Sequence, residues 1–236
     1  MEENKFAEQV YNENMNHESQ RAAVEARRQD ALERKAEFFG KWLWILFVMI
    51  IPTTITALIS LDIVSGSYAA MRWINPLLEL VCAIVSAIIL LKMSEREYQY
   101  RIAGVLYIIG NMINKVVEVT ELPNPWAVFI LIPAGVLGLV ATYNEFMGHA
   151  SVMSEIDNVL AEKWRKLWKW LLIGIGSIFG SIVVMLVSVI VGLIVFLISA
   201  IAVAVMAIMK MVYLYRSAKA CSRWLEDTST EMENML

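Results

Sequence analysis

The chain has 236 residues, of which 58% are hydrophobic and 18% charged, and its formal net charge is −3. Soluble domains average roughly 45–50% apolar residues, so a water-soluble globular fold is not expected, and the small net charge gives no indication of nucleic-acid binding. Two cysteines (Cys82, Cys221) and two histidines (His17, His149) are too few and too widely spaced for a disulfide framework or a histidine-rich metal site. The sequence predicts no cofactor and no metal.

Residues 1–40 form a polar segment that carries no signal-peptide core, so the first apolar segment is expected to direct insertion itself. Residues 2–39 contain no proline or glycine and are rich in Glu, Gln, Ala and Arg, which predicts a long cytoplasmic helix. One heptad position recurs along it, at Val10, His17, Val24, Ala31 and Phe38. It could pair with a second copy or with a cytoplasmic protein; the alternative is a solvated arm.

Six apolar segments follow, and a helix needs about 20 such residues to cross a bilayer. They are expected at residues 41–64, 73–91, 102–119, 126–146, 170–188 and 192–213. The last two belong to one apolar run that is too long for a single span, and its only plausible turn residues lie from Ser188 to Gly192. The sequence therefore predicts an all-α, six-span transmembrane domain over 41–215, followed by a cytoplasmic tail over 216–236.

Basic residues alternate between the connections. Eighteen of the 20 lysines and arginines fall in the N-terminal segment with Lys41, in the second and fourth connections or in the tail, with Lys210 counted in the tail, and only Arg72 and Lys115 fall on the other side. By the positive-inside rule, both termini are expected in the cytoplasm of a multi-pass cell-membrane protein. The tryptophans lie at the ends of the predicted segments, where headgroups accommodate indole rings.

Residues 151–169 carry a helical apolar pattern opposite a basic face. Ser154 followed by Asp157 fits a capping box at a helix start. The segment is expected to form an amphipathic interfacial helix that bends into the fifth span, in contact with the lipid bilayer; the alternative is an ordinary polar loop. Its apolar positions are Ile156, Val159, Leu160, Trp164, Leu167 and Trp168.

Ionisable residues inside spans are costly, which makes them functional candidates. Glu79 lies about six residues into the second span, and the third span carries a polar face at 3- and 4-residue spacing near its outer end. Glu79 and Lys115 are expected at similar depth, where they pair or share a hydrated pocket that Asp62 could join. The predicted ligand or ion site comprises Glu79, Asn111, Asn114, Lys115 and Glu118, with Tyr107 on the same face. The alternative is structural, with snorkelling charges and asparagines that bond between helices.

Three further features stand out. Glu145 and His149 are spaced i,i+4 at the inner end of the fourth span and form a second candidate polar group, unless they merely end the span. Pro52 and Pro133 are expected to kink their helices. A GxxxG motif in the fifth span is expected to pack closely against a neighbour and could mediate a homo-oligomer; its glycines are Gly176 and Gly180.

Signatures of enzymes such as HExxH, GxSxG and CxxC are missing from the sequence, so an enzyme is not expected. Two functions remain. The polar face and the prolines favour a small transporter or channel-like protein for an ion or small solute. The alternative is a non-transporting scaffold, regulator or effector that binds a protein partner through its cytoplasmic helices. Against transport, the last hairpin is wholly apolar from Leu171 to Met209, so the sequence indicates no polar path to the inner face.

Overall fold

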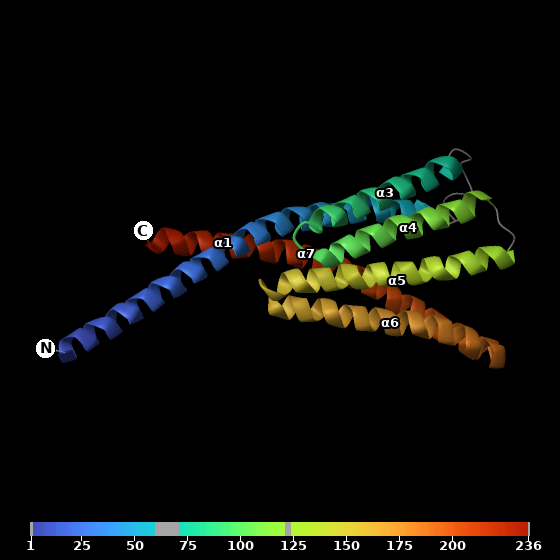
Figure 1. Cartoon of the computed structure of the whole chain (residues 1–236). Coiled ribbons are helices and arrows are strands. Elements are labelled where there is room, and N and C mark those ends of the chain that lie inside the picture. Colours follow the sequence, from blue (N-terminus) through green and yellow to red (C-terminus); the bar gives the residue numbers. More distant parts are fainter. Residues whose placement is uncertain (1, 60–70, 121–123, 236) are drawn as a thin grey trace.

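The computed structural model describes residues 2–59, 71–120 and 124–235, and every regular element in these ranges is an α-helix (Figure 1). The helices are α1 (Glu2–Ile59), α3 (Met71–Met93), α4 (Tyr98–Thr120), α5 (Asn124–Ser154), α6 (Asn158–Val187) and α7 (Val189–Met235). Within the described residues, α1, α5, α6 and α7 are long and apolar enough to cross a membrane. The predicted all-α class is confirmed, and these four helices indicate membrane association.

The helices run up and down in chain order and close into a ring. Each contacts the next, from α1 and α3 through to α6 and α7, and α7 in turn contacts α1. The start of α1, the connections at 94–97 and 155–157 and the end of α7 lie at one end of the bundle, called here the termini end (Figure 1). Ser188 lies at the opposite end, called here the far end. The ring has an interior in which residues from several helices meet.

The break between the last two helices falls where the sequence predicts it. α6 ends at Val187, Ser188 adopts an extended conformation with φ −151°, and α7 begins at the following residue. The two helices therefore diverge from a very tight turn. A Cβ atom on Gly192 would collide with Met185 on the opposing helix, so a residue without a side chain is needed at this position.

The expected interfacial helix over residues 151–169 is not what the structure contains. Its first residues form the last turn of α5, which ends at Ser154, and the remainder opens α6, which continues unbroken to Val187. The N-cap is Asp157, whose carboxylate accepts a hydrogen bond from the backbone N–H of Leu160 at 3.0 Å. The apolar side faces the bundle, where α5 and α7 cover it. Its buried residues are Leu160, Ala161, Trp164 and Leu167.

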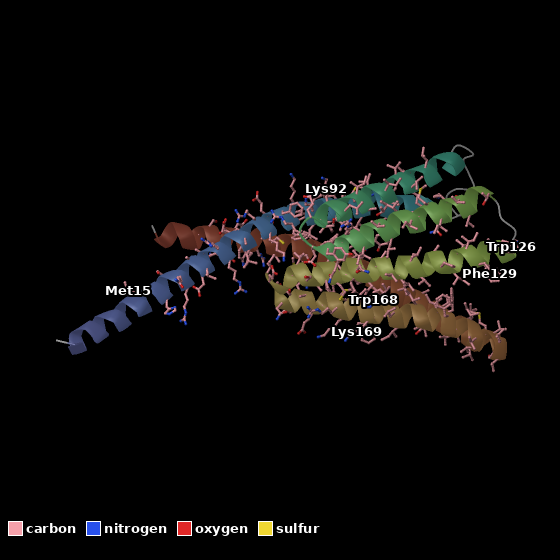
Figure 2. All side chains as sticks on the ribbon, viewed as in Figure 1. Met15, Lys92, Trp126, Phe129, Trp168 and Lys169 are labelled. Carbon is pink, nitrogen blue, oxygen red and sulfur yellow. The ribbon has the colours of Figure 1, made fainter. Side chains whose placement is uncertain are left out.

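The hydrophobic core is concentrated toward the termini end. Aromatic rings pack there against each other and against small residues; Phe39 lies 5.9 Å from Tyr100 and Phe146 lies 5.4 Å from Trp164, measured between ring centroids. Toward the far end the α6–α7 hairpin diverges from α3 and α4 (Figure 1). Apolar side chains are exposed there, including Val187 at 90%, and Figure 2 shows this end carrying Trp126 and Phe129. In a bilayer, lipid would cover such residues.

Helix α1 is 58 residues long and continues through Pro52. It passes well beyond the bundle at the termini end (Figure 1). From Ser19 to Ala31 every side chain is exposed, and Val24, at a predicted heptad position, is 65% exposed. The long N-terminal helix is therefore present, while its self-association stays a prediction.

The two glycines of the GxxxG motif do not pack against the rest of the chain. A Cβ on Gly176 or Gly180 would meet nothing within 4 Å among the described residues. Gly174, two residues before Gly176, makes the close approach instead, because a Cβ there would lie 2.7 Å from Cε of Met206 on α7. Close packing within the chain was assigned to the wrong glycines, and a homo-oligomer through Gly176 and Gly180 stays a prediction.

Candidate functional site

The five residues predicted as a ligand or ion site come together between α3 and α4. Lys115 Nζ lies 2.6 Å from Glu118 Oε2 and 3.4 Å from Glu79 Oε2. Both carboxylate side chains are about half exposed, at 53% and 55%. A small cavity of about 140 Å³ is lined by Glu79, Asn111, Asn114, Lys115 and Glu118. Asp62, which the sequence suggested as a further member, lies outside the described residues.

The five residues of this site are called here the outer cluster, and Asn111 connects them to the interior of the ring. Its side-chain Nδ2 donates a hydrogen bond to the backbone carbonyl of Tyr107 at 2.8 Å. The same side chain lines both the outer cavity and a second, deeper one. The polar face predicted on α4, from Tyr107 to Glu118, therefore leads from the small cavity into the ring interior.

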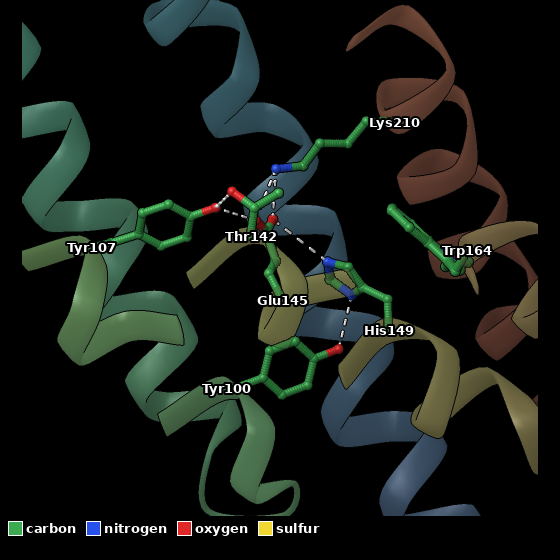
Figure 3. A network of polar contacts seen from close by, with 8 residues as sticks. Tyr100, Tyr107, Thr142, Glu145, His149, Trp164 and Lys210 are labelled. Carbon is green, nitrogen blue, oxygen red and sulfur yellow. Dashed lines mark hydrogen bonds and ion pairs between the residues drawn. The ribbon is translucent and has the colours of Figure 1, made fainter. Parts of the chain in front are cut away.

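The centre of the interior holds a buried ion pair. Glu145 on α5 is 3% exposed, and its Oε1 and Oε2 lie 2.8 and 2.9 Å from Nζ of Lys210 on α7. The hydroxyl of Tyr107, on α4, donates to Glu145 Oε2 at 2.7 Å and lies 3.1 Å from the hydroxyl of Thr142 (Figure 3). A carboxylate only accepts hydrogen bonds, so an ammonium and a phenol are suitable partners. The ion pair and Tyr107 together join α4, α5 and α7 across the ring.

His149 extends the network toward the termini end. It lies one turn beyond Glu145 and is fully buried, with Nε2 3.7 Å from Glu145 Oε1, which is longer than a hydrogen bond. Its Nδ1 lies 2.8 Å from the hydroxyl of Tyr100 (Figure 3). The imidazole packs on Trp164, at 4.5 Å between ring centroids, and the indole N–H donates to Ser217 Oγ at 3.0 Å.

Glycine at position 148 allows α4 and α5 to bring Tyr100 and His149 together. A Cβ on Gly148 would lie 2.9 Å from Cε1 of Tyr100, closer than nonbonded carbon atoms approach. The tyrosine ring therefore lies directly over the backbone of α5, one residue before the histidine. The hydrogen bond between the phenol and the imidazole depends on this close approach.

A cavity of about 270 Å³ lies beside the ion pair in the ring interior. Five helices line it: α1, α3, α4, α5 and α7. Lys210 lines it and its side chain keeps 31% exposure, whereas the Glu145 side chain keeps 4%. The other polar side chains that line it are Thr53, Ser86, Tyr107 and Asn111. The cavity thus combines apolar walls with a few convergent polar groups, as small-ligand sites usually do.

The polar series also reaches the termini end. Beyond Tyr100, Ser151 Oγ on α5 donates to Glu97 Oε2, at the start of α4, at 3.1 Å. Polar side chains therefore continue from Lys115 to Glu97 along α4 and its neighbours. The sequence analysis considered the last hairpin alone and did not include these side chains on the helices that face it.

Lys210 is the functional candidate that the sequence analysis missed. It was counted among the basic residues of the tail, although it lies inside the predicted last span. It is the only charged side chain between Lys169 and Arg216. A lone charge in so long an apolar stretch is a signal in itself, since an unpaired ammonium in lipid is costly. A buried partner on another helix was therefore to be expected.

Among the described residues, no group of three or more His, Cys, Asp or Glu side chains could hold a metal ion. The interior instead contains two sets of polar contacts. The Glu145 carboxylate contacts the Lys210 ammonium and the Tyr107 phenol, and the Tyr100 phenol contacts the His149 imidazole. Comparison with protein families, curated proteins and solved structures finds no match, so the function is argued from these residues alone.

Proposed function

We propose that this chain is a six-span cell-membrane protein that moves a small cation or a small solute through the interior of its helix ring. Four helices are already long and apolar enough to span. α3 and α4 have 23 residues each, which at about 1.5 Å per residue matches a hydrocarbon core of about 30 Å. They run antiparallel beside the other four, which supports six spans.

Both termini are proposed to lie in the cytoplasm. The start of α1, the connections at 94–97 and 155–157 and the end of α7 share one end of the bundle (Figure 1). Seventeen of the 20 lysines and arginines lie in these segments or in the helix ends next to them. The positive-inside rule then assigns the termini end to the cytoplasm.

The observation that carries the transport proposal is the Glu145–Lys210 pair beside the interior cavity. Burying two charges costs several kcal/mol each before their attraction is counted, and a purely structural bundle can avoid that cost with apolar residues. A carboxylate that already accepts from an ammonium and a phenol can exchange the ammonium for an entering cation or proton. The cavity of about 270 Å³ limits the cargo to a hydrated ion or a small solute, since a water molecule takes roughly 30 Å³.

The outer cluster is proposed as the entrance from the far end. Lys115, Glu79 and Glu118 are partly exposed around a small cavity. Asn111 links that cavity to the central one. At the other end, Tyr100, His149 and Glu97 supply polar groups toward the cytoplasmic side.

Flux measurements in proteoliposomes test this proposal. Wild type is compared with Glu145→Gln, Lys210→Met and the double variant, for protons and several monovalent cations. The matched control is the exposed pair on α6, Glu162→Gln with Lys166→Met, whose charges lie 3.6 Å apart on the outside of the bundle. Flux should fall at least tenfold in each interior variant that still inserts and folds, and should be unchanged in the control.

The double variant separates transport from structure, because it removes both buried charges and leaves no unpaired ion. A folded double variant with wild-type flux, or the absence of flux in wild type across these ions and small solutes, would make the pair a structural contact. Glu79→Gln and Lys115→Met then locate the entrance. Loss of flux in these two variants supports a path between α3 and α4.

The exposed part of α1 favours a second candidate function, in which the chain is a scaffold or regulator for a cytoplasmic protein. The side chains from Ser19 to Ala31 are exposed along a helix that extends past the bundle (Figure 2, near Met15). Deleting residues 2–31 removes this arm and spares the ion pair of Lys35 with Glu155. Intact insertion with loss of captured partners supports this function, whereas unchanged cellular activity contradicts it.

A further inference from the structure

A groove lies outside the ring, between the beginning of α6 and the part of α7 beyond Lys210. It has a volume of about 560 Å³ and is unconnected with the ion pair described above. Four basic side chains line it, Lys163 from α6 and Arg216, Lys219 and Arg223 from α7. The three residues of α7 are spaced by three and four positions, so they share one helix face. The groove therefore concentrates positive charge from two helices.

None of these four cations has a carboxylate partner among the side chains that the structure describes. In the part of the chain that the structure describes, none of them forms an ion pair within 4 Å, whereas Lys35, Lys92 and Lys166 each do. Two carboxylates also line the groove, and one of them, Asp157, is engaged as the cap of α6. Four basic groups thus face two acidic ones. Because the positive charges of these four side chains repel each other, an anionic ligand in the groove would be stabilising.

The groove also has an apolar side. Leu160 and Trp224 line it, and so does Tyr215, whose ring packs edge-on against Trp44 at 5.5 Å between centroids. A free inorganic anion would use the basic side chains and leave these surfaces without a partner. A ligand that is anionic at one point and apolar at another satisfies both sides.

The position along α7 fits the headgroup layer of a membrane. Apart from Lys210, residues 189–215 of α7 carry no charge, and Arg216 is the first charged residue after this apolar run. The hydrocarbon core is about 30 Å thick within a bilayer of about 40–45 Å, which leaves several ångströms of headgroup region on each side. A groove at this depth meets the phosphate groups of lipids, and basic pockets between helices bind such headgroups.

We propose that this groove binds the phosphate-bearing headgroup of an anionic phospholipid. Arg216 and Arg223 can each present two N–H donors to phosphate oxygens, while Lys163 and Lys219 contribute point charges. The excess of basic groups favours an anionic headgroup over a zwitterionic one. The proposal does not depend on transport, because it uses none of the residues of the interior network.

Lipid retention by the full-length protein tests the proposal. Native mass spectrometry in detergent counts bound phosphatidylglycerol and phosphatidylcholine for wild type and for Arg216→Gln with Arg223→Gln. The control is Arg27→Gln with Arg28→Gln, which removes the same charges from the exposed part of α1. Wild type and control should retain phosphatidylglycerol about tenfold better than phosphatidylcholine. The groove variant should lose that preference, as expected when charge-assisted contacts to the phosphate are removed.

Soluble anions separate a lipid site from a site for free phosphate. Inorganic phosphate and glycerol phosphate, each at millimolar concentration, should leave phosphatidylglycerol bound. Displacement of the lipid by inorganic phosphate would overturn the assignment to a lipid, and so would equal retention of the two lipids by wild type or unchanged retention by the groove variant. If the double arginine variant does not fold, the wild-type comparison and the single change Lys219→Gln decide the question.

Discussion

The two ends of the bundle differ in what fills the space between the helices. From the centre to the termini end, aromatic rings and small residues pack closely, and the buried polar groups of Glu145 and His149 have partners on other helices. Toward the far end, charges around Lys115 stay partly exposed and α6 and α7 turn apolar side chains outward. Close packing of side chains therefore stabilises the termini end, whereas the apolar side chains of the far end need lipid around them.

The largest effect is expected from truncating the aromatic core of the termini end. Trp164→Ala removes a fully buried ring that contacts Phe146 and His149, and should lower the free energy of unfolding by about 4 kcal/mol. Trp126→Ala at the far end, where the side chain is 65% exposed, should change it little. Denaturant unfolding in detergent micelles measures both. Equal losses would show that the two ends are packed alike.

Next in size is the loss of one partner of the buried ion pair. Lys210→Met leaves the Glu145 carboxylate buried without its ammonium and should cost about 3 kcal/mol of unfolding free energy. Adding Glu145→Gln to that variant should restore much of the loss, because no unpaired charge then remains. The comparison is made with Lys166→Met, whose partner Glu162 is exposed. A double variant that is less stable than Lys210→Met alone would contradict this account.

A smaller cost is expected where α4 and α5 approach most closely. Gly148→Ala places a methyl group 2.9 Å from Cε1 of Tyr100, so the ring must shift, at a cost of about 2 kcal/mol. Gly135→Ala is a control on the same helix, because a Cβ there meets nothing within 4 Å among the described residues. Thermal unfolding in micelles reports both variants. A neutral Gly148→Ala would mean that Tyr100 is not held against α5.

The smallest effect is expected at the outer cluster. Lys115→Met removes ion pairs with two carboxylates that are about half exposed, and exposed pairs contribute about 0–1 kcal/mol. Its stability should therefore stay within about 1 kcal/mol of wild type, even if flux falls. Unfolding and flux measured on the same preparation check this separation. A loss comparable to that of Lys210→Met would make the two clusters equivalent.

The helix boundaries could be predicted where charged residues bracket an apolar run. The segments expected at 73–91 and 102–119 lie within α3 and α4, which end or begin near Lys92 and Arg101. The break at Ser188 was predicted because a single helix would be too long to fit the bilayer. In each case a local property of the chain determines the result.

The arrangement of helices around the interior could not be predicted in the same way. Glu145 and Lys210 are 65 positions apart, and α7 is apolar on all sides over residues 189–209, so no periodicity shows which face turns inward. The segment 151–169 was assigned to the membrane surface for a related reason. An amphipathic pattern looks the same whether its apolar side meets lipid or other helices, and only the neighbouring helices decide.

The unbroken course of α1 has a mechanical consequence. The exposed stretch that ends at Ala31 and the wall residues Leu46, Met49 and Thr53 of the central cavity belong to one helix. Some 22 residues separate Ala31 from Thr53, about 33 Å at 1.5 Å per residue. A rigid helix of that length would act as a lever, so a torque applied to the exposed arm would tilt the cavity wall at its other end. The arm and the cavity wall would then move together.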